Sequence, residues 1–183
     1  MPAVPVRAAL AIGRAGGATT LLNPAPANAA TTDALLGQCE VLVPNETEFV
    51  ALLSRHAGVI LAADEVAVTD DAALHALCRQ LLPAGTVVVT LGAAGCFVSH
   101  PDGARRGDAV AHYRLAAEPA AAVDTTGAGD AFIGALAASL AGPDQAFRGH
   151  VAFANRYAAL STETAGAALA MPTLGAFAVR FPA

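Results

Sequence analysis

The sequence contains no lysine, because all ten of its basic residues are arginines. The P-loop of nucleotide-hydrolysing proteins needs a lysine directly after its glycines, so the chain cannot contain one. Enzymes that form a Schiff base with a substrate or cofactor also need a lysine amine. The missing lysine therefore excludes two classes of chemistry.

Cysteines, charges and long apolar runs are also scarce. Cys39, Cys78 and Cys96 lie far apart in apolar surroundings, which predicts free buried thiols in a reducing cytoplasm and neither a zinc site nor a disulfide framework. No apolar run reaches about 18 residues, the length of a membrane-spanning helix. The net charge of −5 argues against a nucleic-acid footprint. We therefore expect a cytoplasmic protein that binds neither nucleic acid nor a membrane.

What is present is enough for one globular α/β domain of 183 residues with 55% hydrophobic content. Apolar periodicity and turn residues predict helices at 4–15, 31–37, from 49 onward, 70–82, 131–141, 144–164 and after 172, and strands at 19–22, 40–43, 86–91, 96–99 and 109–115. The alternation of strands and helices in the first half predicts a parallel sheet covered by helices. The glycine turn at 92–95 adds an antiparallel pair, so the sheet is expected to be mixed at this edge.

The stretch Val123–Phe132, with the sequence V-D-T-T-G-A-G-D-A-F, precedes an apolar run that is long enough for a helix. Glycines at a helix N-terminus let backbone N–H groups approach an anion, and the helix dipole favours negative charge there. Asp130 places a base beside the same spot. The alternative is that these residues form only a cap and a turn. A dinucleotide fingerprint is excluded, since Phe132 stands where its third glycine would be.

A second polar cluster, Pro44–Glu48, directly follows a predicted strand. Ligands of open α/β sheets bind at the carboxyl ends of strands, so the cluster has the position of a binding site. Acidic residues are also favourable in the first turn of any helix, and the residues alone leave both interpretations open.

Four motifs in a fixed order resemble the C-terminal half of the ribokinase family, also called PfkB carbohydrate kinases. They are N-P-A-P at 23–26, P-N-E-T-E at 44–48, T-L-G-A-A-G at 90–95 and D-T-T-G-A-G-D at 124–130. The resemblance covers residues 5–175, and the first motif favours ribokinase itself within the family. It implies that residues 1–183 form the nucleotide-binding, C-terminal part of a single ribokinase-like domain. The implied fold is a three-layer α/β/α sandwich whose sheet is mostly parallel with an antiparallel edge.

The resemblance implies ATP-dependent phosphorylation of a sugar, with D-ribose and ATP giving ribose 5-phosphate and ADP. Asp130 would take the proton from the attacking hydroxyl. Gly127, Ala128 and Gly129 would form the anion hole for the transferred phosphoryl group. ATP and a small sugar are thus the expected partners.

The resemblance also assigns nucleotide and metal contacts. Asn45 and Glu48 match the family's N-x-x-E motif, which arranges Mg²⁺, waters and phosphates. The other implied nucleotide-binding residues are Thr90, Leu91, Gly92, Ala93, Ala94, Gly95, Gly129 and, near adenosine, Asn155. The positions that match the family's K⁺ site are Asp124, Thr126, Ser161, Thr164, Gly166 and Ala170. Ala170 departs from the usual serine, so one ligand there would be a carbonyl or a water.

Family features of the N-terminal half have no counterpart in this sequence. They are a G-G-K-G-A-N-like motif, an early sugar-gripping aspartate and the β-sheet lid through which full-length relatives homodimerise. We therefore expect an apparently truncated kinase with an exposed sheet edge at 19–22. The alternatives are a non-catalytic nucleotide-binding fragment or pseudo-kinase, and another PfkB enzyme such as a fructokinase, a nucleoside kinase or a 2-keto-3-deoxygluconate kinase.

Overall fold

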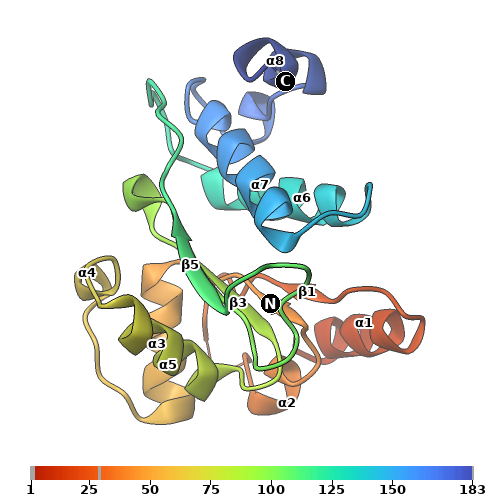
Figure 1. The fold of residues 1–183 in the computed structure, drawn as a ribbon, viewed down its shortest axis with the longest axis vertical. Helices are drawn as coiled ribbons and strands as arrows, with labels where there is room; N and C mark the ends of the chain where they lie inside the picture. The colour runs from red at the N-terminus through yellow and green to blue at the C-terminus, as the bar shows by residue number, and fades with distance from the viewer. Residues whose placement is uncertain (1–2, 29, 183) are drawn as a thin grey trace. The chain divides into compact units, whose positions relative to one another are not determined.

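The structure, a computed structural model, describes residues 3–28 and 30–182. The chain divides into two compact units. The first unit comprises the chain up to residue 105 together with residues 109–115, and the second comprises residues 106–108 and the chain from 116 onward. In Figure 1 the first unit runs from red to green, and most of the second is cyan to blue.

The first unit is built on a mixed five-stranded sheet in the order β1-β2-β3-β4-β5. Its strands are β1 (Leu21–Leu22), β2 (Val41–Leu42), β3 (Thr86–Thr90), β4 (Cys96–Ser99) and β5 (His112–Leu115). The strands β1, β2 and β3 pair in parallel, whereas β3, β4 and β5 pair antiparallel. The predicted mixed sheet with an antiparallel edge is confirmed. Two of the four strand pairs are parallel and two are antiparallel, and each antiparallel pair registers four residues against two in each parallel pair.

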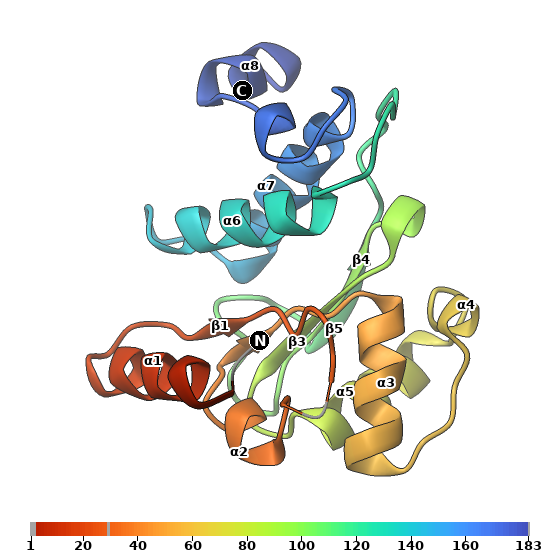
Figure 2. The ribbon, with the colours of Figure 1, turned by 180° about the vertical axis from the view of Figure 1, so that it is seen from behind.

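Helices pack on one face of this sheet (Figure 2). They are α1 (Ala3–Ala15), α2 (Asp33–Leu36), α3 (Glu46–Ala57), α4 (Ala63–Val66) and α5 (Asp71–Leu81). The 3-10 turn η1 (Gly92–Ala94) connects β3 to β4. The buried stripe of α3 is Phe49, Leu52 and Leu53, and that of α5 is Leu74, Cys78 and Leu81. These side chains pack with Val87, Val89 and Phe97 of the sheet in one apolar core. Burial of each large apolar side chain contributes about 1.5–3 kcal/mol.

The second unit is helical within the described residues. It contains α6 (Ala128–Leu140), α7 (Phe147–Ser161), the 3-10 turn η2 (Ala168–Ala170) and α8 (Leu174–Arg180). The helices α6 and α7 pack side by side (Figure 1). The buried face of α6 includes Ala131 and Ala135, whose small side chains allow close approach. The helix α6 begins earlier than the predicted Ala131, because Gly127 takes a left-handed φ of 82° and caps it.

The three cysteines are buried and unpaired, as their apolar surroundings in the sequence predict. Cys39, Cys78 and Cys96 are free and buried, and burial raises the pKa of each thiol to about 12. Such thiols stay protonated and unreactive at neutral pH. Within residues 3–28 and 30–182, no helix has the length and apolar character needed to cross a bilayer.

Candidate functional site

Three of the four motifs lie at the carboxyl ends of the parallel strands of the first unit. Asn23 follows β1, and its Nδ2 donates to the carbonyl of Val43, which follows β2, at 2.9 Å. The N–H of Thr90, at the end of β3, donates to the carbonyl of Pro44 at 2.9 Å. Asn45 and Thr90 also form a parallel bridge. The sheet thus gathers motifs that lie up to 67 positions apart in the chain at the edge where α/β proteins bind ligands.

Asn45 and Glu48 form a capping box at the start of α3. The Asn45 side chain accepts a hydrogen bond from the Glu48 N–H at 2.9 Å, and the Glu48 carboxylate accepts one from the Asn45 N–H at 3.0 Å. Glu48 is only 8% exposed. The helix-start interpretation of this motif is therefore confirmed, and the nucleotide role of both residues stays a prediction. A cap leaves the second oxygen of the carboxylate for other contacts.

The loop after β3 turns sharply through two glycines. Gly92 has a φ of 51° and Gly95 has a φ of 91°, values that favour glycine. The Leu91 N–H donates to the Gly95 carbonyl at 2.8 Å, which closes the turn. Leu91 is buried, whereas Ala93 and Ala94 are exposed at its tip. The tip of the loop thus exposes small side chains and backbone groups to solvent.

The fourth motif forms the N-terminus of α6 in the second unit. Ala128, Gly129 and Asp130 are its first three residues. The Ala128 N–H donates to the Thr125 carbonyl at 3.1 Å. The N–H groups of Gly129 and Asp130 have no acceptor among the described residues. A Cβ on Gly129 would have no atom within 4 Å, so open space lies beside these donors. The exposed Asp130 carboxylate belongs to the same turn.

Gly127 is constrained by its surroundings as well as by its backbone. A Cβ added there would lie 3.4 Å from Ala167 and 3.4 Å from the Met171 Cε. The residue also has a left-handed φ of 82°. Any side chain at this position would therefore strain the helix start and disturb the segment that follows α7.

Asp124 ties the motif to the loop that follows α7. Its carboxylate accepts hydrogen bonds from the N–H of Thr126 and the N–H of Gly166, both at 2.9 Å. These bonds hold the pKa of Asp124 below its ordinary value, so the side chain is ionised at neutral pH. Asp124, Thr126 and Gly166 of the predicted cation site are thus brought together.

Among the other predicted cation and nucleotide residues, Ser161 and Asn155 donate side-chain hydrogen bonds to backbone carbonyls. The Ser161 hydroxyl donates to the Ala158 carbonyl at 2.8 Å, Ala170 is buried at the end of η2, and Thr164 is exposed. Asn155 donates from Nδ2 to the Ala116 carbonyl at 2.7 Å. Among the described residues, no three His, Cys, Asp or Glu side chains gather as a metal site.

A comparison of the whole sequence with protein families decides its relationship. The model of the pfkB family of carbohydrate kinases matches residues 1–174. The chain belongs to this family.

Individual pfkB relatives agree with the assignment. Ribokinase from Schizosaccharomyces pombe is 33% identical over 177 residues, which cover 95% of this chain and 50% of the relative. The crystal structure of ribokinase from Thermotoga maritima matches with a TM-score of 0.74 at 24% identity and covers 93% of this chain and 51% of that one. The structure of Arabidopsis thaliana ribokinase complexed with ribose and ATP matches with a TM-score of 0.71 at 25% identity, over 96% of this chain and 51% of that one. The chain thus has the ribokinase-like fold and spans about half the length of these relatives.

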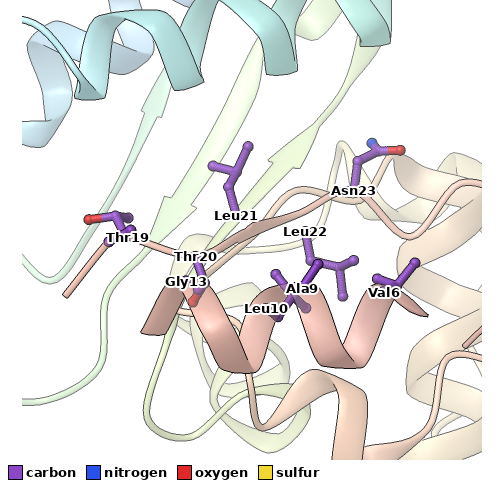
Figure 3. Close-up of a pocket in the computed structure, with 10 residues that line it drawn as sticks. Val6, Ala9, Leu10, Gly13, Thr19, Thr20, Leu21, Leu22 and Asn23 are labelled. Carbon is purple, nitrogen blue, oxygen red and sulfur yellow. The ribbon is translucent and has the colours of Figure 1, made fainter. Parts of the chain in front are cut away.

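The pfkB chain also has an apolar groove away from most motif residues. A cavity of about 410 Å³ runs between α1 and β1 and is lined by Val6, Ala9, Leu10, Gly13 and residues 18–23 (Figure 3). Asn23 is the motif residue in this lining. Because β1 is an edge strand, the groove follows the exposed sheet edge that the sequence predicts.

Two charged residues near the motif at 124–130 were missed by sequence reasoning. The Glu163 carboxylate accepts the Ala121 N–H at 3.3 Å and lies 3.5 Å from Arg180. These residues match no family motif. An arginine in the last turn of a helix is a recognisable signal, but it indicates only a favourable interaction with the helix dipole.

Proposed function

We propose that this chain is the nucleotide-handling part of an ATP-dependent carbohydrate kinase, with D-ribose as the acceptor. The observation that carries the proposal is the start of α6. There the N–H groups of Gly129 and Asp130, which have no acceptor in the part of the chain that the structure describes, share one turn with the Asp130 carboxylate beside open space. The match to the pfkB family of carbohydrate kinases supports phosphoryl transfer from ATP as the reaction of this turn.

In the proposed reaction Asp130 accepts the proton of the sugar hydroxyl as that oxygen attacks the γ-phosphate of ATP. The exposed carboxylate is accessible to a substrate hydroxyl. The N–H groups of the first turn, together with the helix dipole, stabilise the negative charge that builds on the transferred group. Gly127 keeps the turn in the required conformation, and Ala128 forms its first residue. This division of roles needs no lysine.

We further propose that Asn45 and Glu48 arrange Mg²⁺ with the ATP phosphates. Amide and carboxylate oxygens are the donors that this ion prefers, and the capping box holds both side chains together at the end of β2. When bound, Mg²⁺ neutralises phosphate charge. The exposed backbone of the loop at 90–95 would contact the nucleotide, and Asn155 would lie near adenosine.

A K⁺ ion is proposed beside Asp124. The residues fit a monovalent cation, because the Asp124 carboxylate stays ionised. Its hydrogen bonds to Thr126 and Gly166 also bring together the loop before α6 and the loop after α7, whose backbone carbonyls could bind the ion. Carbonyls of 161, 164 and 170 would complete the ligands. The ion would supply positive charge near the anion hole.

The choice of ribose rests on the relatives. Ribokinase from Schizosaccharomyces pombe is similar over 95% of this chain, and the Arabidopsis thaliana ribokinase that shares the fold is complexed with ribose and ATP. The chain spans half of each, so the sugar is assigned by similarity alone.

A coupled assay of ADP release with ribose, ATP, Mg²⁺ and K⁺ tests the proposal. We expect ribose-dependent turnover that falls by at least about a hundredfold in Asp130→Asn, because general-base catalysis contributes about 10² to 10⁴. Asp144→Asn, an exposed carboxylate before α7, is the matched control and should retain the rate. Turnover that is unchanged in Asp130→Asn would exclude Asp130 as the base.

A second candidate is a nucleotide-binding module without catalysis. ATP binding without phosphorylation of ribose or another sugar would support this candidate over the first.

A further inference from the structure

The segment at 116–122 leads directly from β5 into the Asp124 motif and contains no helix or strand. Three side chains from two later helices of the second unit hold it. Asn155 of α7 bonds the Ala116 carbonyl at 2.7 Å, and Arg156 of α7 lies 3.3 Å from Glu118. Arg180 of α8 donates to the Pro119 carbonyl at 2.8 Å. An irregular segment is thus fixed by side chains and not by a ladder of backbone bonds.

Arg180 makes a second contact, with Glu163 in the loop that follows α7. Its guanidinium lies 3.5 Å from the Glu163 carboxylate, which also accepts the Ala121 N–H. The preceding residue, Thr162, accepts the N–H groups of Val123 at 2.7 Å and Asp124 at 3.1 Å through its carbonyl. Arg180 therefore links the segment before Asp124 to the loop that follows α7, and that loop also supplies the Gly166 N–H to Asp124.

The helix α8 is held against α7 by aromatic packing. The Phe177 ring lies 4.8 Å from Phe153 and 5.0 Å from Phe181, measured between centroids. The Arg180 guanidinium lies over the Phe181 ring at 4.9 Å. The Tyr157 hydroxyl donates to the Pro172 carbonyl at 2.6 Å just before α8. The backbone from which Arg180 projects is therefore well supported, and the arginine loses less freedom when it binds.

We propose that Arg180 is a positioning residue. Through Arg180, α8 holds the segment at 116–122 to the loop at 162–166, and these two segments fix Asp124 and the start of α6. We call this set of contacts the clasp. The functional value of the clasp rests on the proposed phosphoryl-transfer function, but its structural effect does not. Without Arg180 the segment at 116–122 and the loop at 162–166 separate more often, and the bonds from Thr162 and Gly166 to the Asp124 region open with them.

Amide hydrogen exchange on the whole chain tests the clasp without requiring activity. In Arg180→Gln we expect the amides of Ala121, Val123 and Asp124 to exchange roughly fivefold faster, which corresponds to the net loss of one typical hydrogen bond. Amides inside α6 and in the first unit should keep their rates. Arg180→Lys, which retains the charge but not the fork of donors, should show a smaller increase. Arg7→Gln, an exposed arginine of α1, is the control and should change none of these amides.

Two results would overturn the proposal. One is unchanged exchange at 121–124 in Arg180→Gln. The other is a uniform increase across both units, because that would show a general loss of stability. Glu163→Gln provides a second variant and should accelerate the same amides.

ADP binding then tests whether the clasp positions the start of α6 for nucleotide binding. If the wild-type chain binds ADP, Arg180→Gln should raise the Kd severalfold, and an unchanged Kd would contradict a positioning role. If the wild-type chain binds no ADP, the proposed function fails, and the exchange data still decide whether the clasp exists.

Discussion

At the scale of single residues, Asn45 and Glu48 combine a structural role with a proposed functional one. Each caps α3 through a hydrogen bond of about 3 Å to the other's backbone. Loss of such a cap costs about 1 kcal/mol of stability. A substitution that removes the cap would therefore lower the stability of the fold, and a loss of nucleotide affinity in that variant could not be assigned to a lost contact with the nucleotide.

Asn45→Ser and Glu48→Gln separate the two roles. Serine is a good N-cap and glutamine can complete a capping box, so both variants should unfold at nearly the wild-type denaturant midpoint. If these residues arrange Mg²⁺ and phosphates, the affinity for MgATP should fall about tenfold in each, measured by calorimetry. Asn45→Ala serves as the control that loses the cap and should cost about 1 kcal/mol. Unchanged affinity in both variants would limit the motif to its role in the helix.

Asp124 gives the second unit a predictable response to acid. Its pKa is lowered in the folded chain by the N–H groups of Thr126 and Gly166. A lowered folded pKa means that the unfolded chain binds more protons, so stability is present above about pH 4 and is lost as the pH falls through the folded pKa. Asp124→Asn replaces one acceptor oxygen by an amide and should flatten this dependence in unfolding curves between about pH 5 and 2. Asp144→Asn should leave the curve unchanged, and an equal slope in Asp124→Asn and wild type would contradict the assignment.

At the scale of elements, the sequence predicts the long helices and the central strands well. Apolar periodicity locates α3 and α5, and the continuous apolar run of β3 identifies a buried strand. The short elements α4 and η2 were not predicted, because four or three residues carry no periodic signal. The start of α6 was placed too late, since glycine and alanine in its first turn resemble a loop in composition. The capping geometry of Gly127 appears only once the backbone is known.

The edge strand β1 predicts association of the isolated chain. It borders the groove between α1 and β1, and the nearby Ile12 of α1 is 74% exposed. An unpaired strand edge beside apolar surface favours pairing with another copy. We expect concentration-dependent oligomers in sedimentation velocity. Thr19→Lys, a charge at this edge, should shift them toward monomer, whereas Ile60→Lys, at a site that is 85% exposed and distant in sequence, should not. A monodisperse wild-type monomer would contradict this expectation.

At the scale of the whole molecule, sequence motifs predict most of the candidate residues that lie within each compact unit. The motifs identify Asn45, Glu48, Asp124 and Asp130 because each is surrounded by a characteristic local pattern. The contacts of Arg180 with Pro119 and Glu163 have no such pattern, since they join positions up to 61 residues apart. The sugar acceptor is likewise not determined by the motifs, and the chain spans about half of the relatives.

Calorimetric titration of the whole folded chain with ATP and Mg²⁺ tests the central claim most directly. The account predicts saturable binding of one nucleotide per chain, which weakens in Glu48→Gln and persists in Asp130→Asn, because Asp130 acts on the acceptor hydroxyl and not on the nucleotide. Absence of ATP and ADP binding by a chain that melts cooperatively would contradict the account.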